Sequence, residues 1–425
     1  MRRTAPKWLL LLAVGASSAL SLASASAQEA DLPALRAAVK ANPSDPDAAL
    51  ALGRALRRAG RFAEAATELT RGAGRAGAKG AALRYELARV KVDQRDHSGA
   101  LVACKGLPPA LAAACRAEAH LVQNRATEAM PEVERALKLD ASLYEAKVAE
   151  GRALRLQGKV DEAQAALSTA AASAPGRPEA HFFAGELLLA LGRKQEGLAA
   201  LTRARGADAN DPVIAFTLGE ALGSSREARD ALAAATRIRP GYAEAQAQLA
   251  RVSLDLGDIA GADAAAQAAV RSDAKLFAAQ VALGRVRIAQ KRWDEALKAG
   301  EDAKKLIKNA AAGELIVADA LAGKGDIDLA VDAYQRAFGL DRTDPAPLVR
   351  AATACREAGR STTARGFVDR VTTDFPKWAP GWVEAAELAL AQGDKPRARK
   401  ALETALTAEG PVDKGAVRAR LAAIK

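Results

Sequence analysis

Residues 144–177 read YEAKVAEGRALRLQGKVDEAQAALSTAAASAPGR, a segment with two helical patterns separated by glycine. Apolar residues recur at helical spacing over residues 144–157, Gly158 interrupts the pattern, and it resumes over residues 161–172 before Pro175. Gly and Pro in these places mark the ends of helices. The stretch therefore predicts two antiparallel helices, each followed by a turn.

The same pattern occurs eleven times, and each copy opens with a small residue that usually follows the previous one after 34 positions. These residues are Gly53, Ala88, Ala117, Gly151, Gly185, Gly219, Ala250, Gly284, Ala318, Ala352 and Ala386. A second small residue generally stands twelve positions later, at Ala65, Ala100, Ala129, Ala163, Gly197, Ala262, Ala296, Ala330, Ala364 and Ala398. Self-similarity at this period predicts a helical solenoid, in which each helix pair becomes stable by stacking on its neighbours.

The small residues are interpreted as packing positions. Gly151 and Ala163 are expected on the facing sides of the two helices of one repeat. A side chain larger than methyl there would hold the helix axes farther apart than the roughly 8–10 Å of close packing. Ala170 lies on the same face as Ala163, and this face must admit the next repeat.

These residues resemble the tetratricopeptide repeat family, whose pattern places small residues on both helices and Pro at the repeat boundary. The resemblance covers roughly residues 31–412 and is carried in the first repeat by Leu52, Gly53, Gly60, Ala65 and Leu69, and in the last by Trp382, Ala386, Gly393, Ala398 and Ala405. It implies an all-α fold, a right-handed superhelical solenoid of about eleven antiparallel helix pairs. It also implies that the chain binds other proteins.

The N-terminus predicts export. Residues 1–27 are interpreted as a signal peptide, because basic residues precede an apolar run and Ala25-Ser26-Ala27 forms a small-residue cleavage site. An uncleaved membrane anchor is the alternative, but the run is shorter than the roughly 20 apolar residues of a spanning helix. No apolar run beyond residue 28 approaches that length. The periplasm is the expected location, with an extracellular or membrane-anchored protein as alternatives.

The rest of the chain is predicted to form a lead-in helix at 28–45, the solenoid at 46–412 and a polar capping helix at 413–425. Two repeats depart from the pattern. The interval from Ala88 to Ala117 is 29 residues instead of 34, and Gly219 to Ala228 is nine residues instead of twelve. Each departure is expected to produce a local bend or a docking point.

Composition leaves the partner open between several classes. The formal net charge of +11 favours acidic partners. Lys and Arg nevertheless alternate with Asp and Glu throughout, as on solvated helix faces. Nucleic acid is not expected, because the chain is predicted to be exported and lacks aromatic residues interleaved with basic ones.

No catalytic, metal or cofactor motif is predicted. Gly72–Gly77 matches GxGxxG, but that motif binds dinucleotides only between a strand and a helix, so a structural loop is expected here. His97, His120 and His181 lie far apart in sequence and have no metal-ligand spacing. We therefore predict that the chain is not an enzyme and that it needs no cofactor.

Three cysteines allow two interpretations. An oxidising compartment would favour a disulfide between Cys104 and Cys115, which closes a short loop worth about 3 kcal/mol in chain entropy. Their unequal distances from the turn at Gly106–Pro109 suggest an offset of several ångströms, and this favours two buried thiols instead. Cys355 is expected in the core.

The resemblance also implies a concave binding groove lined by the first helix of each repeat. The position three residues before each small residue is apolar or aromatic in every repeat, and the position after it is mostly charged. The candidate groove residues are Leu50, Arg54, Tyr85, Arg89, Val148, Arg152, Phe182, Phe216, Val281 and Arg285. With Arg57, Arg58 and Arg155 the groove is expected to be basic in its N-terminal half. The alternative is that the apolar stripe is buried between helices.

Two functional classes follow. The favoured one is a non-enzymatic scaffold of the bacterial cell envelope that binds an extended peptide or a helix of another protein in its groove. The alternative is a binder of an anionic envelope glycan, or an accessory subunit of an envelope assembly or secretion enzyme complex. Electrostatic glycan binding should be lost at high ionic strength, whereas an apolar groove should retain its partner.

Overall fold

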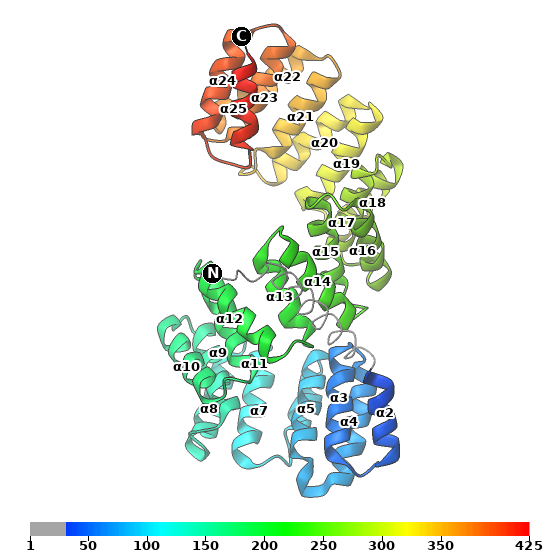
Figure 1. Cartoon of the computed structure of the whole chain (residues 1–425), viewed down its shortest axis with the longest axis vertical. Helices are drawn as coiled ribbons and strands as arrows, with labels where there is room; N and C mark the ends of the chain where they lie inside the picture. The colour runs from blue at the N-terminus through cyan, green and yellow to red at the C-terminus, as the bar shows by residue number, and fades with distance from the viewer. Residues whose placement is uncertain (1–30, 425) are drawn as a thin grey trace, which may run out of the picture. The chain divides into compact units, whose positions relative to one another are not determined.

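The computed structural model describes residues 31–424, which form twenty-four α-helices and one short 3-10 helix (Figure 1). The first half contains α2 (Asp31–Ala41), α3 (Pro46–Arg58), α4 (Phe62–Ala76), η1 (Gly77–Gly80), α5 (Ala81–Asp93), α6 (His97–Ala103), α7 (Pro109–Leu121), α8 (Ala126–Leu139), α9 (Tyr144–Leu156), α10 (Val160–Ser173), α11 (Pro178–Ala190), α12 (Lys194–Ala207) and α13 (Pro212–Leu222).

The second half continues in the same manner with α14 (Arg226–Ile238), α15 (Ala243–Asp255), α16 (Ile259–Ser272), α17 (Phe277–Ala289), α18 (Trp293–Leu306), α19 (Ala311–Lys324), α20 (Ile327–Leu340), α21 (Ala346–Glu357), α22 (Ser361–Asp374), α23 (Ala379–Ala391), α24 (Lys395–Thr407) and α25 (Lys414–Ala423). Residues 31–424 contain no strand, and Trp378 and Glu409 form an isolated bridge. The predicted all-α solenoid of helix pairs is confirmed.

Local sequence signals set the ends of the helices. Pro46 stands in the first turn of α3, where its missing N–H costs no hydrogen bond, and the Asp45 carboxylate caps the helix by accepting from the backbone N–H groups of Asp47 and Ala48. After α9 the chain turns at Gly158, whose φ of 76° is a left-handed conformation that glycine adopts without strain. Helix pairs of nearly constant length follow from such signals.

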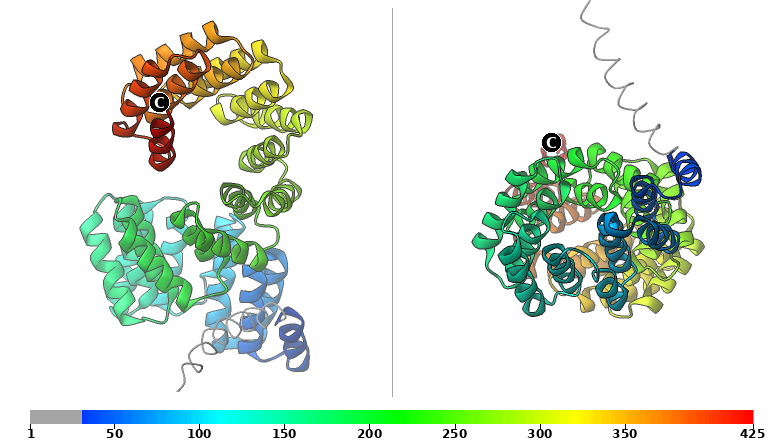
Figure 2. Two further views of the ribbon diagram at one scale, coloured as in Figure 1. Left: turned by 45° about the horizontal axis from the view of Figure 1, so that its top comes forward. Right: turned by 90° about the horizontal axis from the view of Figure 1, so that it is seen from below.

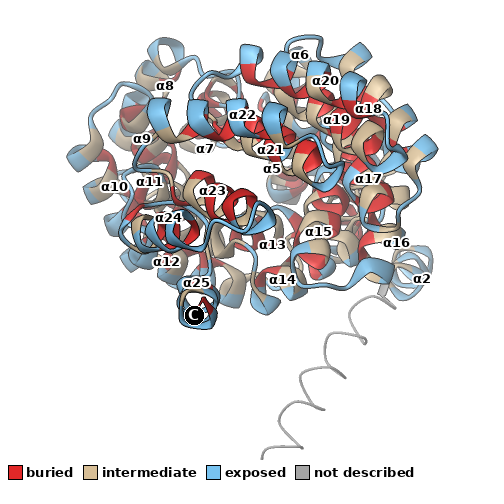
Figure 3. Cartoon of the chain, turned by 90° about the horizontal axis from the view of Figure 1, so that it is seen from above, coloured by how far each residue is buried: buried red, intermediate tan, exposed pale blue. Residues whose placement is uncertain are grey.

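The predicted packing positions are buried where helices face each other (Figure 3). Ala163 and Ala170 are 0% exposed, and a Cβ atom added to Gly151 would lie 2.5 Å from Cγ of Leu167. That distance is far inside van der Waals contact, so any side chain at this crossing would force Leu167 to move. The small residues therefore set how closely the two helices of a repeat approach.

Contacts divide the chain into two compact units, each treated separately below. Unit 1 comprises the described residues up to Gly223 together with Asp230–Gly241. Unit 2 comprises Ser224–Arg229 and the described residues from Tyr242 onward. The shortened sixth repeat, in which Gly223 ends α13 with a φ of 76°, lies at this division.

The shortened second repeat holds the two neighbouring cysteines. Helix α6 has only seven residues and ends at Ala103, so Cys104 lies at its C-cap. Cys104 and Cys115 form a disulfide with their Cα atoms 5.7 Å apart. The expected offset was wrong, because the chain after the short helix folds back far enough to bring Cys104 level with Cys115 on α7. Cys355 is a buried free thiol, as expected.

Other segments lie as follows. The predicted signal peptide lies outside the described residues.

The Gly72–Gly77 segment, expected as a loop, forms the last turns of α4 and the start of η1. A dinucleotide site would need a strand before this helix, but the element before α4 is the helix α3. Within residues 31–424, no helix combines the length and apolar character that a bilayer span requires.

Candidate binding site on the inner helices of unit 1

A pocket of about 740 Å³ lies within unit 1, on the side formed by the first helices of its repeats. Helices α3, α5, α7, α9, α11 and α13 all contribute to its wall. Six arginines and seven carboxylates line it: Arg54, Arg57, Arg58, Arg89, Arg152 and Arg177, with Glu86, Asp93, Glu118, Glu145, Glu179, Asp208 and Asp211. The expected basic groove is therefore wrong for this unit, because carboxylates balance the arginines, and all of them except Glu118 stand outside the predicted groove positions.

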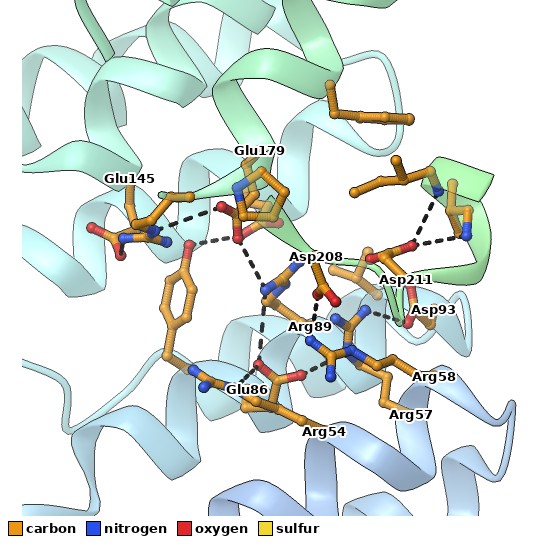
Figure 4. A pocket seen from close by; sticks show the side chains of 18 of the residues that line it. Arg54, Arg57, Arg58, Glu86, Arg89, Asp93, Glu145, Glu179, Asp208 and Asp211 are labelled. Carbon is orange, nitrogen blue, oxygen red and sulfur yellow. Dashed lines mark hydrogen bonds and ion pairs between the residues drawn. The ribbon is translucent and has the colours of Figure 1, made fainter. Parts of the chain in front are cut away.

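Glu86 is the centre of the largest group of ion pairs (Figure 4). Its side chain is 1% exposed, and Oε1 accepts from Nε of Arg57 at 2.6 Å. Arg54 and Arg89 approach its other oxygen at 3.4 and 3.8 Å. Burial by itself would raise the pKa of Glu86, but the three guanidinium groups outweigh burial and lower that pKa to about 2. The carboxylate is therefore charged at neutral pH.

Several contacts join repeats that are not neighbours. Arg58 pairs with Asp208, 150 residues later, and the guanidinium of Arg89 lies 3.4 Å from Glu179. Nε of Arg239 donates to the backbone carbonyl of Arg58 at 3.1 Å. Within unit 1 the helices thus curve back until the region of α12 and α13 meets α3 (Figure 2). In an ordinary solenoid each repeat contacts only its neighbours.

The opposite wall is built around Tyr144 and Arg177. The guanidinium of Arg177 pairs with Glu145 at 2.7 Å and lies 3.9 Å from the centroid of the Tyr144 ring. The Tyr144 hydroxyl accepts from the backbone N–H of Ala180 at 3.0 Å and donates to Glu179 at 3.4 Å. Burial raises the pKa of Tyr144 to about 12, so the phenol stays neutral.

Arg152 differs from the other pocket arginines. Its guanidinium lies over the ring of Phe183, 4.2 Å from the centroid, and among the described residues no carboxylate lies within ion-pair distance of it. Glu118, on the neighbouring helix α7, accepts a hydrogen bond of 2.9 Å from the hydroxyl of Tyr85 and likewise forms no ion pair with a described residue. Among the described residues, the pocket therefore contains one cation and one anion that form no ion pair, although Glu118 lies near enough to act on the pKa of Arg152.

The candidate groove residues fall into three groups. Arg54, Tyr85, Arg89, Arg152 and Phe182 line the pocket, as Arg57 and Arg58 also do. Val148 is 6% exposed and belongs to the core, although it borders a small cavity next to the pocket. The remaining residues lie elsewhere: Leu50 packs partly buried on α3, Phe216 is partly buried on α13, and Val281 and Arg285 belong to α17 in unit 2.

Sequence reasoning missed the acidic half of the pocket. Glu86 stands two positions before Ala88, and Asp208 and Glu179 lie at or near the turns between repeats, outside the expected groove positions. A weak signal exists for Glu86, because a carboxylate between two apolar neighbours in a buried helix needs a partner. For Asp208 no local signal exists, because its partner is 150 residues away.

Two of the three histidines lie side by side in the structure although they are far apart in sequence. The rings of His97 and His120 are 5.2 Å apart at their centroids, and Nδ1 of each ring is buried without a hydrogen-bond partner. Burial, followed by the neighbouring His97, lowers the pKa of His120. Over residues 31–424, His, Cys, Asp and Glu side chains form no group of three or more that could hold a metal ion.

Comparison with protein families gives one match that extends over about half of the chain. The matching model is described as tetratricopeptide repeat, and it matches residues 32–81, 148–212, 247–313 and 275–345. The four segments include parts of both units. No curated protein matched the chain.

Three solved structures illustrate the likeness in fold. A tetratricopeptide repeat protein from Parabacteroides merdae is 16% identical over 66% of this chain and 97% of its own, with a TM-score of 0.44. Yeast Tom70 is 13% identical over 89% of this chain and 95% of its own, with a TM-score of 0.46. The Cut9–Hcn1 hetero-tetramer of APC/C is 14% identical, with 95% of this chain and 94% of that chain covered and a TM-score of 0.44.

Proposed function

The chain belongs to the tetratricopeptide repeat family, and we propose that it is a non-enzymatic scaffold of the bacterial cell envelope. In this proposal the inner face of the array binds an extended peptide or a helix of a partner protein. The repeat fold supports protein binding in general. The envelope location rests on the predicted signal peptide at residues 1–27.

The main support for a partner-binding groove is that apolar residues on the inner helices are partly exposed to solvent. Phe182 lines the pocket in unit 1 beside Val213, which is 37% exposed. In unit 2 the equivalent residues of four successive repeats, Val281, Leu315, Val349 and Val383, are all partly exposed. A stripe that only packed helices together would be buried, as Val148 is. Solvent-accessible apolar residues in register suit a partner that contacts successive repeats.

Pairing of the pocket arginines favours a protein partner over an anionic glycan. Five of the six arginines already have carboxylate partners. Their charge is therefore largely neutralised, and long-range attraction of a polyanion is weakened. Binding that persists at high ionic strength supports the apolar groove, and binding abolished by salt supports the glycan alternative.

Photo-crosslinking in living cells can identify the partner at this surface. A photoreactive phenylalanine at position 182 should crosslink a discrete partner that mass spectrometry identifies. The same residue at Leu139, which is 55% exposed at the end of α8, serves as the control and should not give that product. Mass spectrometry of the exported chain would also show whether it begins at Gln28.

The effect of the stripe can then be measured with that partner. Changing both Phe182 and Phe216 to Ser should weaken binding by about 2 kcal/mol or more while the melting temperature falls little, because aromatic anchors often dominate interfaces. If the double variant unfolds early and binding per folded molecule is unchanged, the stripe is core and the groove must be abandoned.

A further inference from the structure

Arg152 and Glu118, which form no ion pair with a described residue, suggest that the unit 1 pocket binds a small charged ligand. From Arg152 and Glu118, we propose that the pocket binds a small zwitterion of the α-amino acid type, with its carboxylate on the Arg152 guanidinium and its ammonium group on the Glu118 carboxylate. This activity goes beyond scaffolding and does not depend on a protein partner.

The cation is held in place but lacks an anion. The guanidinium of Arg152 lies over the ring of Phe183, and this cation–π contact holds it at the pocket wall. Withdrawal from water lowers the pKa of Arg152 even though Glu118 is nearby. The Arg152 side chain is partly buried, so a ligand carboxylate bound to it would form a charge-assisted hydrogen bond that the protein itself does not supply.

The anion stands one repeat away along the same row of positions. Glu118 and Arg152 each follow the opening small residue of their repeat, Ala117 and Gly151, so they project from equivalent points of adjacent helices. The Tyr85 hydroxyl donates to Glu118 at 2.9 Å and holds its carboxylate. Burial and Glu118 keep the pKa of Tyr85 well above its usual value, so this donor stays protonated. The remaining acceptor positions of Glu118 suit an ammonium group.

The surrounding pocket has the size and lining of a small-molecule site. Its volume of about 740 Å³ lies within the roughly 300–1,000 Å³ of known ligand pockets. Phe182, Phe183, Val213 and Ile214 provide an apolar wall for a ligand side chain. The other charged residues have partners within the protein or cap a helix, as Asp211 does for α13, so they do not compete for the ligand.

The corresponding positions of unit 2 provide a natural comparison. Arg251 and Arg285 follow Ala250 and Gly284, as Glu118 and Arg152 follow theirs. Two cations at these positions cannot bind both ends of a zwitterion. Asp319, at the same position of the following repeat, already pairs with Arg350 and accepts from the Tyr334 hydroxyl. Arg285 is therefore a matched control for Arg152, at the same repeat position but without an acidic neighbour in the preceding repeat.

Binding can be tested with the full chain and the twenty L-amino acids, each added separately. We expect one or a few to raise the melting temperature and to bind by titration calorimetry. For the tightest binder, the N-acetyl derivative and the methyl ester each remove one charge and should bind at least about tenfold more weakly, as expected when a charged hydrogen bond is lost. Absence of binding by all twenty amino acids overturns the proposal.

Variants assign the two charges separately. Arg152→Gln should weaken binding of the unmodified amino acid but should hardly change binding of the methyl ester. The ester has already lost the carboxylate that would contact Arg152. Glu118→Gln should correspondingly leave binding of the N-acetyl derivative unchanged. Arg285→Gln should bind like the unaltered chain. The proposed zwitterion site is contradicted if N-acetylation does not reduce the affinity of the amino acid. It is also contradicted if Arg152→Gln binds the amino acid with unchanged affinity while circular dichroism shows that this variant is folded. Arg152→Lys tests the same point if the Gln variant does not fold.

Discussion

The same ion pair occurs in both units but in different surroundings. In unit 1, Nε of Arg57 donates to Glu86 at 2.6 Å, and in unit 2, Nε of Arg356 donates to Glu384 at 2.7 Å. Each arginine stands four positions after the opening small residue of its repeat, and each glutamate two positions before that of the next. Repeat geometry therefore determines the pair.

The difference lies in what else contacts the glutamate. Position one after the small residue is Arg54 in unit 1 and Thr353 in unit 2, so Glu86 receives a second guanidinium where Glu384 receives a hydroxyl at 2.9 Å. Arg89 adds a third cation beside Glu86. The same backbone positions thus form a structural pair in unit 2 and part of a charged pocket in unit 1. A repeat scaffold can change its site without changing its fold.

The largest expected effect follows from removing Glu86. Glu86→Gln removes the carboxylate that Arg54, Arg57 and Arg89 share, and leaves Arg57 with only Asp93 and Arg89 with only Glu179. It should lower the free energy of unfolding of unit 1 by about 3 kcal/mol. Glu384→Gln should cost unit 2 less, because it releases one arginine. Urea denaturation of residues 28–425 can separate the units, because Trp293, Trp378 and Trp382 all lie in unit 2. Tryptophan fluorescence then reports unit 2, and circular dichroism reports both.

A surface pair supplies the control for this comparison. Glu64 pairs with Arg36 at 2.5 Å but remains 44% exposed, so Glu64→Gln should change the free energy of unfolding much less than Glu86→Gln does. Equal losses for Glu86→Gln and Glu384→Gln would show that the additional arginines do not distinguish the two sites.

Packing positions should respond alike in the two units. Gly151→Leu in unit 1 and Gly284→Leu in unit 2 should each cost about 1–3 kcal/mol, because even an added Cβ lies 2.5 Å from Leu167 in one case and 2.7 Å from Ile316 in the other. At Gly74, inside α4, no heavy atom lies within 4 Å of an added Cβ. Gly74→Leu should therefore be neutral or stabilising. Measured losses that differ strongly between Gly151 and Gly284 would contradict a shared repeat register.

The smallest expected effect is a pH dependence confined to unit 1. His97, His120 and His181 all lie there, so unit 2 contains no histidine among the described residues. Because folding lowers the pKa of His120, the unfolded chain binds the proton first as pH falls. The stability due to neutral His120 is therefore present above its ordinary pKa of 6.5 and is lost progressively below it. Thermal melts from pH 8 to pH 5 should show this loss, and His120→Gln should reduce the slope.

The sequence predicts the fold well because the fold depends on local and periodic signals. Gly151, Ala163 and Gly158 each act within one repeat, and the 34-residue period repeats their effect along the chain. The pocket arginines at Arg54, Arg89 and Arg152 were also predicted, because their positions follow the same period.

The pocket's balance of charge could not be predicted in the same way. Asp208 acquires its role only when the helices of unit 1 curve back to Arg58, and no periodic pattern encodes that approach. His97 and His120 meet because the second repeat is short, with α6 only seven residues long. Such juxtapositions depend on the sum of many small rotations between repeats.

The contacts of Arg58 and Arg239 also bear on the order in which the chain can fold as it leaves the ribosome or an export channel. Arg239 lies at the C-terminal end of unit 1, 181 residues after Arg58, whose backbone carbonyl it contacts. Repeats emerging earlier can stack at once, since each needs only its neighbour. The contact between Arg239 and Arg58 can form only after this late arginine has been synthesised or transported. Pairs between adjacent repeats, such as Arg356 with Glu384 in unit 2, can form as soon as the next repeat is present.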